Sequence, residues 1–407
     1  MLFEEIEHPT METFDLEGRL RALETFGMGR TLEPNDRVDR RVRVADAPRG
    51  EPPVFGDETL LLTTNNSLGF ATDERVRRAA KRAIDGVGTG AGGSRVSTGD
   101  TVAHHELERA LATTKRTDRA LAFSSGYAAN VGTITALYPN VIFSDEYNHA
   151  SLIEASRMTD ADTEVYDHCD ADDLAARMER RAEAGPTEKW LIVTDSIFSM
   201  DGDVAPLAEL CNLAEAYGAW VMVDEAHATG LYGDGGGIVT REGLEDRVHV
   251  QMGTLSKALA AQGGYVAGDA TLVEYLANAA RSFVFSTGLA PPAAAAARKA
   301  LELSVETDRV ERLHENADYL RRELDAVGFD VWGTTHIVPL VVGNPRLVIE
   351  FDERLREAGI RVNSVPYPVV PVGTSRLRLT PMATHTREEL DAAIDAFERI
   401  GTELHVI

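Results

Sequence analysis

Apolar and polar positions divide the first two thirds of the chain into short apolar runs and longer segments with helical spacing. The apolar runs are rich in β-branched residues and lie at residues 120–124, 141–144, 190–194, 220–224, 248–252 and 264–267. The segments between them include "DLAARMERRAEAG" and "PLAELCNLAEAYG", and each of these two ends in Gly. Apolar strands that alternate with helices predict an α/β fold, with a mostly parallel sheet that helices cover on both faces. In such a sheet, ligands bind at the carboxyl ends of the strands.

The pattern changes after about residue 290. Long helical segments begin at "PPAAAAARKA" and are followed by "HIVPLVVG", by a helix over residues 347–358 and by a final amphipathic helix from Arg387. This order predicts a small α+β domain over residues 291–407, after a large α/β domain over residues 61–290. Residues 1–60 are charged, helical at the start and then rich in Arg, Asp and Pro, so we expect them to form an N-terminal arm.

The chain is strongly acidic, with 66 Asp and Glu against 41 Lys and Arg and a formal charge of −25. Such a surface repels nucleic acid and anionic membranes. It is typical of a halophilic protein in a high-salt cytoplasm, where ions screen the repulsion, and we expect its stability to depend on salt. Only five of the 41 basic residues are Lys. Because Arg replaces Lys at most basic positions, the Lys that is kept at 257, in "MGTLSKALAAQGGY", is a candidate for a chemical role.

The remaining composition favours a cytoplasmic protein. No stretch approaches 18 uninterrupted apolar residues, and "MLFEEIEHPT" lacks the basic and then apolar order of a signal peptide. The two cysteines, Cys169 and Cys211, have no CxxC spacing. We expect them to be reduced packing residues, and we expect no metal site.

Two charged residues follow neighbouring apolar runs. "WVMVDEAHATG" is an apolar run that ends in Asp224, and Lys257 comes shortly after the next run. A carboxylate in a buried cleft needs a cationic partner, and a protonated pyridine nitrogen would serve. This arrangement suits pyridoxal 5'-phosphate (PLP), with Lys257 as the Schiff-base lysine and Asp224 as the partner of the ring nitrogen.

Further residues fit the same cofactor. "FSSGYAAN" follows a strand and opens a helix, so the backbone N–H groups of Ser125, Gly126 and Tyr127 could hold a phosphate at the positive helix end. His149 follows another strand and could lie flat on the ring, while Ser199 and His227 could bond near the ring hydroxyl. Each motif alone also has a structural explanation, but their joint order favours the cofactor site.

Two other motifs point to different protein classes. "DEAH" is also a helicase box, but the chain has no GxxxxGK[ST] phosphate loop and its surface is acidic. "GTGAGG" resembles a dinucleotide-binding loop, but it follows the helical segment "DERVRRAAKRAIDG" rather than a strand. A non-enzymatic or nucleotide-binding protein therefore stays the weaker alternative.

The ordered set of motifs resembles the α-oxoamine synthases, a PLP family of the aspartate-aminotransferase fold (fold type I). The resemblance runs from "TNNSLGF" to "RLRLT" through "GTGAGGSR", "HHELERALA", "FSSGYAANVGTI", "NHASLIEASR", "FSMDGDVAPL", "VDEAHATGLYG", "GTLSKALAAQGGY" and "FSTGLAPP". It implies a homodimeric acyltransferase with its active sites at the interface. It departs from the family at Ser67 and Val369, where an aromatic residue and a threonine are usual, and throughout the arm.

The resemblance also implies a role for each matching position. Lys257 and Asp224 match the Schiff-base lysine and the ring-nitrogen partner, and His149 matches the histidine that stacks on the ring. The remaining matches are His227 and Ser199 beside the ring hydroxyl, Gly126, Tyr127 and Thr254 beside the phosphate, Thr287 toward the partner subunit's phosphate, Arg378 at the amino-acid carboxylate and Asn65 on the substrate side.

The family joins a small amino acid to an acyl-CoA. "GTGAGGSR" and "HHELE" resemble members that condense L-alanine with pimeloyl-CoA, or its carrier-protein thioester, in biotin biosynthesis. "PYPVVPVG" and the residues after Lys257 resemble members that join glycine to acetyl-CoA. We expect the first activity and keep the second as the alternative, ahead of a plain aminotransferase on the same fold.

Overall fold

The computed structural model describes residues 14–25, 32–46, 51–183, 185 and 187–407. The chain forms two compact units, one of Met1–Asp36 and Arg43–Asp57 and one of Arg37–Val42 and Glu58–Ile407. In the first unit, α1 (Leu16–Thr25) is helical, and an Arg43–Asp36 ion pair of 3.2 Å joins two segments. Residues 1–13 of the expected helical start lie outside the described residues. The arm over residues 1–60 stays a prediction.

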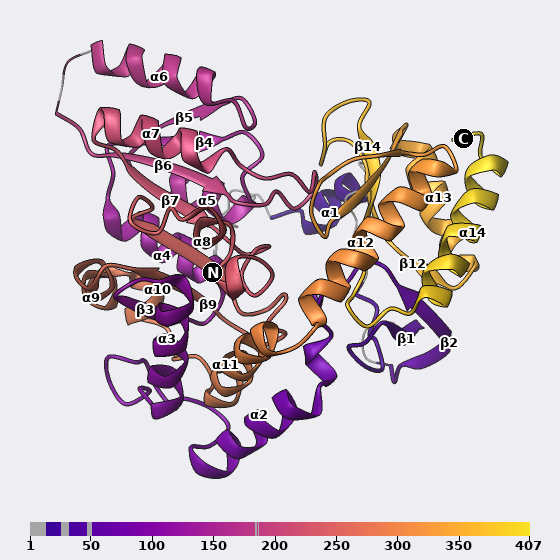
Figure 1. The fold of residues 1–407 in the computed structure, drawn as a ribbon, viewed down its shortest axis with the longest axis horizontal. Coiled ribbons are helices and arrows are strands. Elements are labelled where there is room, and N and C mark those ends of the chain that lie inside the picture. The colour runs from indigo at the N-terminus through magenta and orange to yellow at the C-terminus, as the bar shows by residue number, and fades with distance from the viewer. Residues whose placement is uncertain (1–13, 26–31, 47–50, 184, 186) are drawn as a thin grey trace, which may run out of the picture. The chain divides into compact units, whose positions relative to one another are not determined.

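The second unit contains a seven-stranded sheet (Figure 1). Its strands lie in the order β3 (Arg119–Phe123), β9 (Gly264–Gly268), β8 (Val250–Thr254), β7 (Trp220–Asp224), β6 (Trp190–Asp195), β4 (Val141–Asp145) and β5 (Asp162–Tyr166). Neighbouring strands from β8 to β5 are parallel, and β9 is antiparallel to β3 and β8. The predicted mostly parallel sheet is confirmed, and the six apolar runs are six of its strands.

The sheet differs from the prediction at two points. β5 was not expected because its sequence "DTEVY" is polar, and only Tyr166 in it is buried. It lies at the end of the sheet, where an edge strand has little apolar contact to signal it. β8 ends at Thr254, so Thr254 is the last strand residue rather than part of the following loop.

Helices cover both faces of the sheet, because successive strand residues point to opposite sides. In β6, Leu191 and Val193 pack with α4, α5, α9 and α10, whereas Ile192 packs on the opposite face with α6, α7 and α8. The helices of the first face are α4 (Gly126–Leu137), α5 (Ala150–Arg157), α9 (Ala270–Ala279) and α10 (Arg281–Val284). Those of the opposite face are α6 (Ala171–Glu183), α7 (Leu207–Tyr217), α8 (Ile238–Glu242), α3 (Val102–Lys115) and α11 (Pro291–Glu306), and α2 (Glu74–Gly86) packs on α11.

A smaller antiparallel sheet follows in the sequence. Its order is β10 (Asp330–Val331), β11 (Val338–Gly343), β14 (Ser375–Leu379) and β13 (Asn363–Val365), and its core packs against α12 (Arg309–Ala326), α13 (Pro345–Glu357) and α14 (Arg387–Glu403). β12 (Ile360–Arg361) pairs in parallel with the end of β2 (Val54–Leu61), and β1 (Arg41–Asp46) completes that three-stranded sheet. The helices expected from residues 291, 347 and 387 are present, and the second begins at Pro345 because Asn344 caps it. The domain boundaries at residues 60 and 290 stay a prediction.

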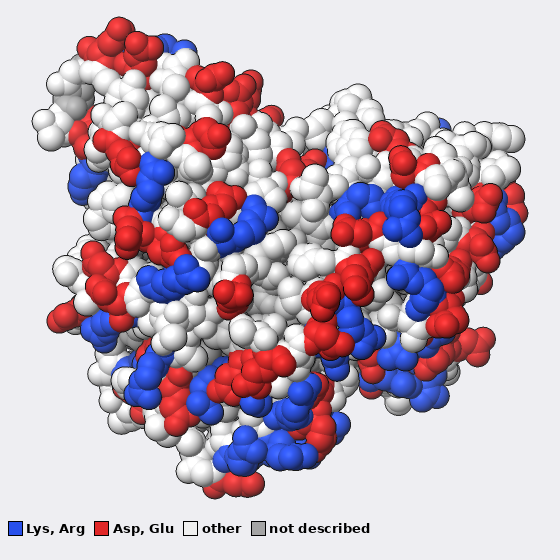
Figure 2. All heavy atoms as spheres, viewed as in Figure 1, with Lys and Arg blue, Asp and Glu red and all other residues white. Residues whose placement is uncertain are grey.

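The surface agrees with the acidic composition. Acidic side chains are spread over the visible face and interspersed with Arg and Lys, instead of gathering in one patch (Figure 2). Both cysteines are free thiols, as expected. Among the helices that the structure describes, none has the length and apolar composition needed to cross a bilayer.

Candidate active site

A cavity of about 250 Å³ lies at the carboxyl ends of the central strands. Nine of the residues predicted from the sequence line it: Ser125, Gly126, Tyr127, His149, Ser199, Asp224, His227, Thr254 and Lys257. These residues come from the ends of β7 and β8, from the loops that follow strands, or from the start of α4. The structure therefore brings together side chains that are up to 132 positions apart in the sequence, from 125 to 257.

Lys257 projects its amine into this cavity. Its Nζ lies 2.8 Å from Nε2 of His227. Burial lowers the pKa of Lys257 to about 8, although the neighbouring carboxyl groups, chiefly that of Asp224, act in the opposite direction. Burial, followed by the charge of Lys257, also holds the pKa of His227 well below its ordinary value. A neutral imidazole therefore faces an amine that is partly unprotonated near neutral pH.

This lowered pKa can be measured on the cofactor-free protein. We expect reductive methylation of Lys257 to rise with pH around a midpoint of about 8 instead of the ordinary 10.5, because the reagent attacks only the neutral amine. Peptide mass analysis at pH values from about 6 to about 10 follows each lysine separately. The exposed Lys189 reports on reagent concentration. A Lys257 midpoint above about 10 would contradict the burial of this amine.

Asp224 is the last residue of β7 and is 3% exposed. Its Oδ2 accepts a hydrogen bond from Asn130 Nδ2 at 2.8 Å, and its Oδ1 accepts one from the backbone N–H of Ala226 at 2.9 Å. Within the described part of the chain, it forms no ion pair. An unpaired buried carboxylate is unfavourable, so the site lacks one cation that a bound ligand would supply.

Asp195 is a second carboxyl group at the same edge. It ends β6, lies opposite Asp224 in the strand register, and accepts a hydrogen bond from the backbone N–H of His149 at 2.7 Å. Burial and the neighbouring charge of Asp224 raise the pKa of Asp195 well above its ordinary value. Asp195 therefore favours its protonated form, which limits the negative charge gathered at this edge.

The amino end of α4 faces the cavity beside Thr254. Ser125 caps the helix, and its Oγ accepts a hydrogen bond from the N–H of Ala128 at 3.0 Å. The N–H groups of Gly126 and Tyr127 lie in the first turn, where no helical carbonyl can accept from them. A Cβ on Gly126 would lie 3.3 Å from Cβ of Thr254, so the helix end and the strand end are in close contact. Together they form a site that suits a phosphate group.

His149 and Ser199 also line the cavity. His149 caps α5, and its Nδ1 accepts from the N–H of Ser151 at 3.2 Å, so the start of the helix orients the ring. Burial lowers the pKa of His149. The carbonyl of Ser199 accepts a hydrogen bond from Nε of Arg378, which is 5% exposed on β14. Burial lowers the pKa of Arg378 to about 10.

Three predicted residues do not line the cavity. Arg378 reaches its edge through Ser199. Asn65 and Thr287 are exposed, and neither is among the lining residues. Their expected roles, toward the substrate and toward the partner subunit's phosphate, stay predictions.

Six of the lining residues were not predicted from the sequence, among them Asp195 and Asn130. Asp195 ends the run "LIVTD" just as Asp224 ends "WVMVD", so the same signal could have identified it. Asn130 lies on α4, one turn after Gly126, and bonds both Asp224 and Ser151 at 2.8 Å. An Asn within a helical segment carries no comparable signal.

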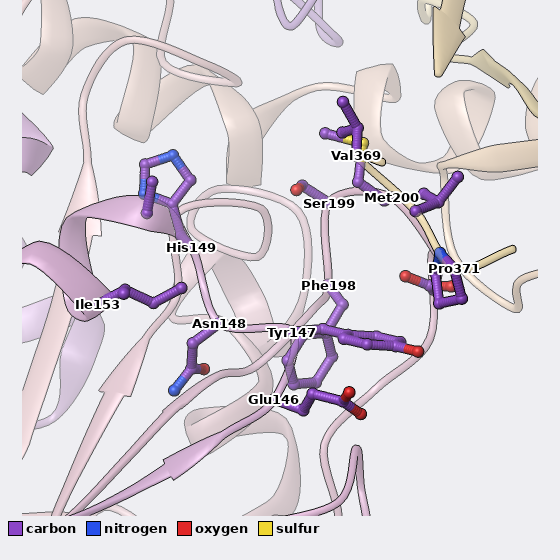
Figure 3. Close-up of a pocket in the computed structure, with 13 residues that line it drawn as sticks. Glu146, Tyr147, Asn148, His149, Ile153, Phe198, Ser199, Met200, Val369 and Pro371 are labelled. Atoms are coloured by element: carbon purple, nitrogen blue, oxygen red, sulfur yellow. The ribbon is translucent and has the colours of Figure 1, made fainter. Parts of the chain in front are cut away.

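A second pocket, of about 430 Å³, shares His149 and Ser199 with the cavity. Figure 3 shows the segment that follows β4 on one side and the segment of Val369 and Pro371 on the other. The lining side chains are mainly apolar or aromatic, namely Tyr147, Ile153, Phe198, Met200, Val369, Val370 and Pro371, with Glu146 and Asp201 as the acidic members. The pocket suits an apolar group placed next to the chemistry at His149 and Ser199.

Comparison with known proteins identifies relatives over almost the whole chain. Residues 57–397 match the family described as aminotransferase class I and II. The chain is 43% identical to 8-amino-7-oxononanoate synthase of Fervidobacterium nodosum, over 92% of this chain and 96% of the relative. It is 44% identical to the enzyme of the same name from Lysinibacillus sphaericus, over 91% and 96% of the two chains.

Solved structures agree with these matches. Serine palmitoyltransferase of Sphingomonas wittichii superimposes with a TM-score of 0.87 and 30% identity, covering 98% of this chain and 100% of that one. A serine palmitoyltransferase variant from S. paucimobilis, solved with PLP and myriocin bound, gives a TM-score of 0.86 and 30% identity over 96% and 98% of the chains. A 23% identical 8-amino-7-oxononanoate synthase of Francisella tularensis shares the fold, with a TM-score of 0.70 over 85% of this chain and 99% of that one.

Proposed function

Because the chain belongs to the aminotransferase class I and II family, we propose that it is a PLP-dependent acyltransferase that makes 8-amino-7-oxononanoate for biotin biosynthesis. In this reaction, L-alanine condenses with pimeloyl-CoA, or with the corresponding carrier-protein thioester, and CO2 and the thiol are released. The single observation that carries the proposal is the identity of 43% to 8-amino-7-oxononanoate synthase over 92% of the chain. The chemistry of the cavity supports it independently.

The cavity provides a group for each part of PLP. Lys257 would hold the aldehyde carbon, and Asp224 would pair with the protonated ring nitrogen, which is the cation that the buried carboxylate lacks. The start of α4 and Thr254 would hold the phosphate, with Ser199 and His227 beside the ring hydroxyl and His149 on the ring face. When bound, PLP supplies a ring that withdraws electrons from the Cα of the amino acid.

The chain itself supplies the proton transfers. The neutral form of Lys257 acts as the general base for the Cα proton, and burial increases this form by lowering the pKa to about 8. Nδ1 of His149 accepts a hydrogen bond from Ser151, so the neutral ring carries its proton on Nε2. Nε2–H then donates to the oxygen of the thioester as negative charge develops there.

The substrates occupy opposite sides of this centre. Arg378 binds the carboxylate of the amino acid, while its Nε stays on the carbonyl of Ser199. The acyl chain extends into the apolar pocket between Tyr147 and Val369. The methyl groups of Val369 are compatible with a methylene chain, although this position holds a threonine in similar sequences.

We propose three further properties from the sequence and the family. The protein is a homodimer in which Thr287 reaches the phosphate site of the partner subunit, and Asn65 lies on the substrate side. It works in the cytoplasm. The acidic surface makes it halophilic, so that its stability rises with salt as ions screen the repulsion between carboxylates.

The decisive experiment crosses L-alanine and glycine with pimeloyl-CoA and acetyl-CoA and measures thiol release at high salt. We expect alanine with pimeloyl-CoA to give the highest kcat/KM, by at least about tenfold, because the apolar pocket adds contacts along the longer chain. Faster turnover of glycine with acetyl-CoA would instead identify a glycine C-acetyltransferase. A keto acid product without thiol release would identify a plain aminotransferase.

A borohydride control separates these enzymes from a protein without the cofactor. Reduction should leave a pyridoxyl group on Lys257 in the peptide mass spectrum. A colourless protein with no such adduct would contradict all three enzymatic proposals.

A further inference from the structure

His168 lies outside the cavity and joins two of the segments that form its walls. It follows β5, and both ring nitrogens face carboxylates: Nδ1 lies 2.9 Å from Oδ1 of Asp145, and Nε2 lies 2.9 Å from Oδ2 of Asp203. The ring stacks on Tyr147 with a centroid distance of 4.4 Å and meets Phe198 edge-on at 4.3 Å. The two hydrogen bonds and the two aromatic contacts together fix the position and the orientation of the His168 ring.

Two carboxylates at the two ring nitrogens require two N–H donors, so His168 is an imidazolium. Its carboxylate bonds outweigh the effect of burial and raise the pKa of His168 to about 12. The other titratable groups beside the ring are the Cys169 thiol and the Tyr147 phenol, and burial raises the pKa of each. Both are therefore neutral at physiological pH, and Asp145 and Asp203 supply the charge that balances the imidazolium.

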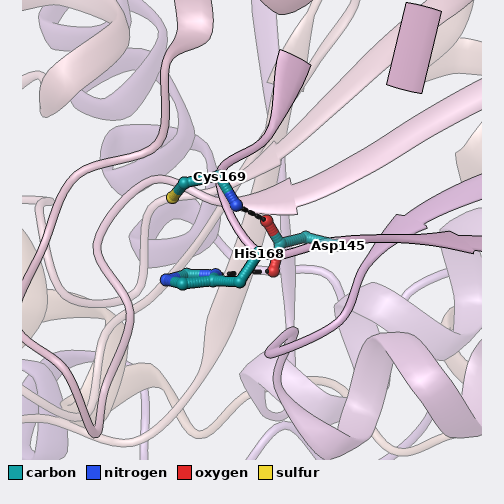
Figure 4. A group of neighbouring side chains, drawn as sticks. All are labelled: Asp145, His168 and Cys169. Atoms are coloured by element: carbon teal, nitrogen blue, oxygen red, sulfur yellow. Dashed lines mark hydrogen bonds and ion pairs between the residues drawn. The ribbon is translucent and has the colours of Figure 1, made fainter. Parts of the chain in front are cut away.

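Asp145, His168 and Cys169 also have donor atoms within 4.8 Å of one another, as in a metal site. Cys169, however, contacts Asp145 through its backbone N–H, which donates to Oδ2 at 2.9 Å (Figure 4). Its Sγ lies 4.0 Å from the carbonyl of Val204. The bonds of this cluster are thus those of a charged hydrogen-bond network.

Each carboxylate belongs to a segment that carries a cavity residue. Asp145 ends β4 and also accepts from the N–H of Tyr147 at 2.9 Å, two residues before His149. Asp203 closes the turn of residues 198–203, in which the N–H of Phe198 donates to the carbonyl of Asp203 at 3.2 Å. Ser199 lies in this turn, and its carbonyl accepts from Arg378.

We propose that His168 is a positioning residue that ties the segment of His149 to the turn of Ser199. The imidazolium sets the separation of two cavity walls without touching the ligand. Through the turn, it also fixes the carbonyl on which Arg378 is oriented. The proposal rests on the proposed function insofar as these walls hold PLP and the amino acid.

The test uses the full-length protein at high salt with His168→Asn, with Asp203→Asn, and with His249→Asn as a matched control. His249 stacks on Trp220 with a centroid distance of 4.9 Å at the opposite end of the same sheet, so its loss removes a comparable ring contact far from the cavity. We expect His168→Asn to weaken PLP binding and to raise KM for the amino acid, each by about 10- to 100-fold, because a displacement of about 1 Å has effects of this size. His249→Asn should leave both unchanged, even if it lowers the unfolding temperature equally.

Imidazole 15N NMR tests the charged state without any ligand. In the wild type, the His168 signals, assigned by their loss in His168→Asn, should show two N–H groups up to at least about pH 9. In Asp203→Asn, the lost carboxylate lowers the pKa of His168, so the PLP affinity of this variant relative to that of the wild type at the same pH should decline as pH rises above about 7. A His168 that titrates near its ordinary 6.5, or a His168→Asn variant with wild-type PLP affinity and KM, would overturn the proposal.

A metal titration tests the alternative that Asp145, His168 and Cys169 form a metal site. If Zn²⁺ binds stoichiometrically, removes one His168 N–H signal and no longer binds His168→Asn, then the cluster is a metal site and the proposal is wrong. The substrate assay can fail separately: a wild type that binds PLP but releases no thiol contradicts the proposed function, while PLP affinity and NMR still decide the role of His168.

Discussion

Lys257→Ala is expected to reduce the rate of thiol release by at least about 10⁴-fold, since in the proposed mechanism one amine both binds the cofactor covalently and removes the Cα proton. The cavity has no second amine: Lys257 is the only lysine among the lining residues of the described chain. His227, 2.8 Å away, is a poor replacement, because burial alone already favours its uncharged form and makes it a weak base. The assay is thiol release from pimeloyl-CoA with L-alanine.

The same samples supply the controls. Lys257→Ala should still bind some PLP through Asp224 and the start of α4, which absorbance after dialysis would show. Added methylamine should restore part of the rate, because it replaces the missing base. Lys189→Ala removes an exposed lysine outside the cavity and should retain wild-type turnover. A Lys257→Ala variant within about tenfold of the wild-type rate would refute the role of this amine.

Lys115→Met is expected to destabilise the protein by about 3–5 kcal/mol, which is typical when one member of a buried ion pair is removed. Lys115 ends α3, is fully buried, and donates to Glu225 and to the carbonyl of Gly236. The carboxylate of Glu225 also accepts from the N–H of Val239 at 2.9 Å. Without the ammonium, a charge would remain buried directly after Asp224. Urea unfolding at fixed salt measures the loss.

The double variant Lys115→Met/Glu225→Gln separates loss of the charge pair from loss of packing. The neutral amide can still accept from Val239, so most of the lost stability should return. The pH dependence has a definite sign. Because Glu225 raises the pKa of Lys115 above its ordinary 10.5, the stabilisation is complete below that pH and disappears only as pH rises through the folded-state value. A Lys115→Met variant within about 1 kcal/mol of the wild type would contradict the ion-pair account.

The sequence predicted the central sheet because its strands are buried on both faces and therefore read as continuous apolar runs. The same reasoning failed for β5, where only Tyr166 is buried. In the cavity, Asp224 and Lys257 could be paired from the sequence because each follows one of two consecutive strands. Asp195 carries the same signal, but no expected ligand group required a second carboxyl group there.

Contacts between distant segments could not be predicted. His168 and Asp203 are 35 residues apart, and Ser199 and Arg378 are 179 residues apart. No spacing rule relates such positions, since His168 and Asp203 follow different strands of one sheet, whereas Ser199 follows a strand of the central sheet and Arg378 lies in the smaller one. The stretch "YDHCDADD" accordingly carries no motif that indicates that two carboxylates hold His168.

The turn of residues 198–203 receives both arginines of β14. Arg376 donates to the carbonyl of Met200 at 3.1 Å and to Asp201 at 2.6 Å, and Arg378 donates to the carbonyl of Ser199. These hydrogen bonds join the four-stranded sheet to a turn at the edge of the central sheet. Any hinge motion that separates the two sheets must therefore displace this turn or break these bonds. Under the proposed function, such a motion would couple release of the product to displacement of Ser199, the residue that we assign to the cofactor hydroxyl.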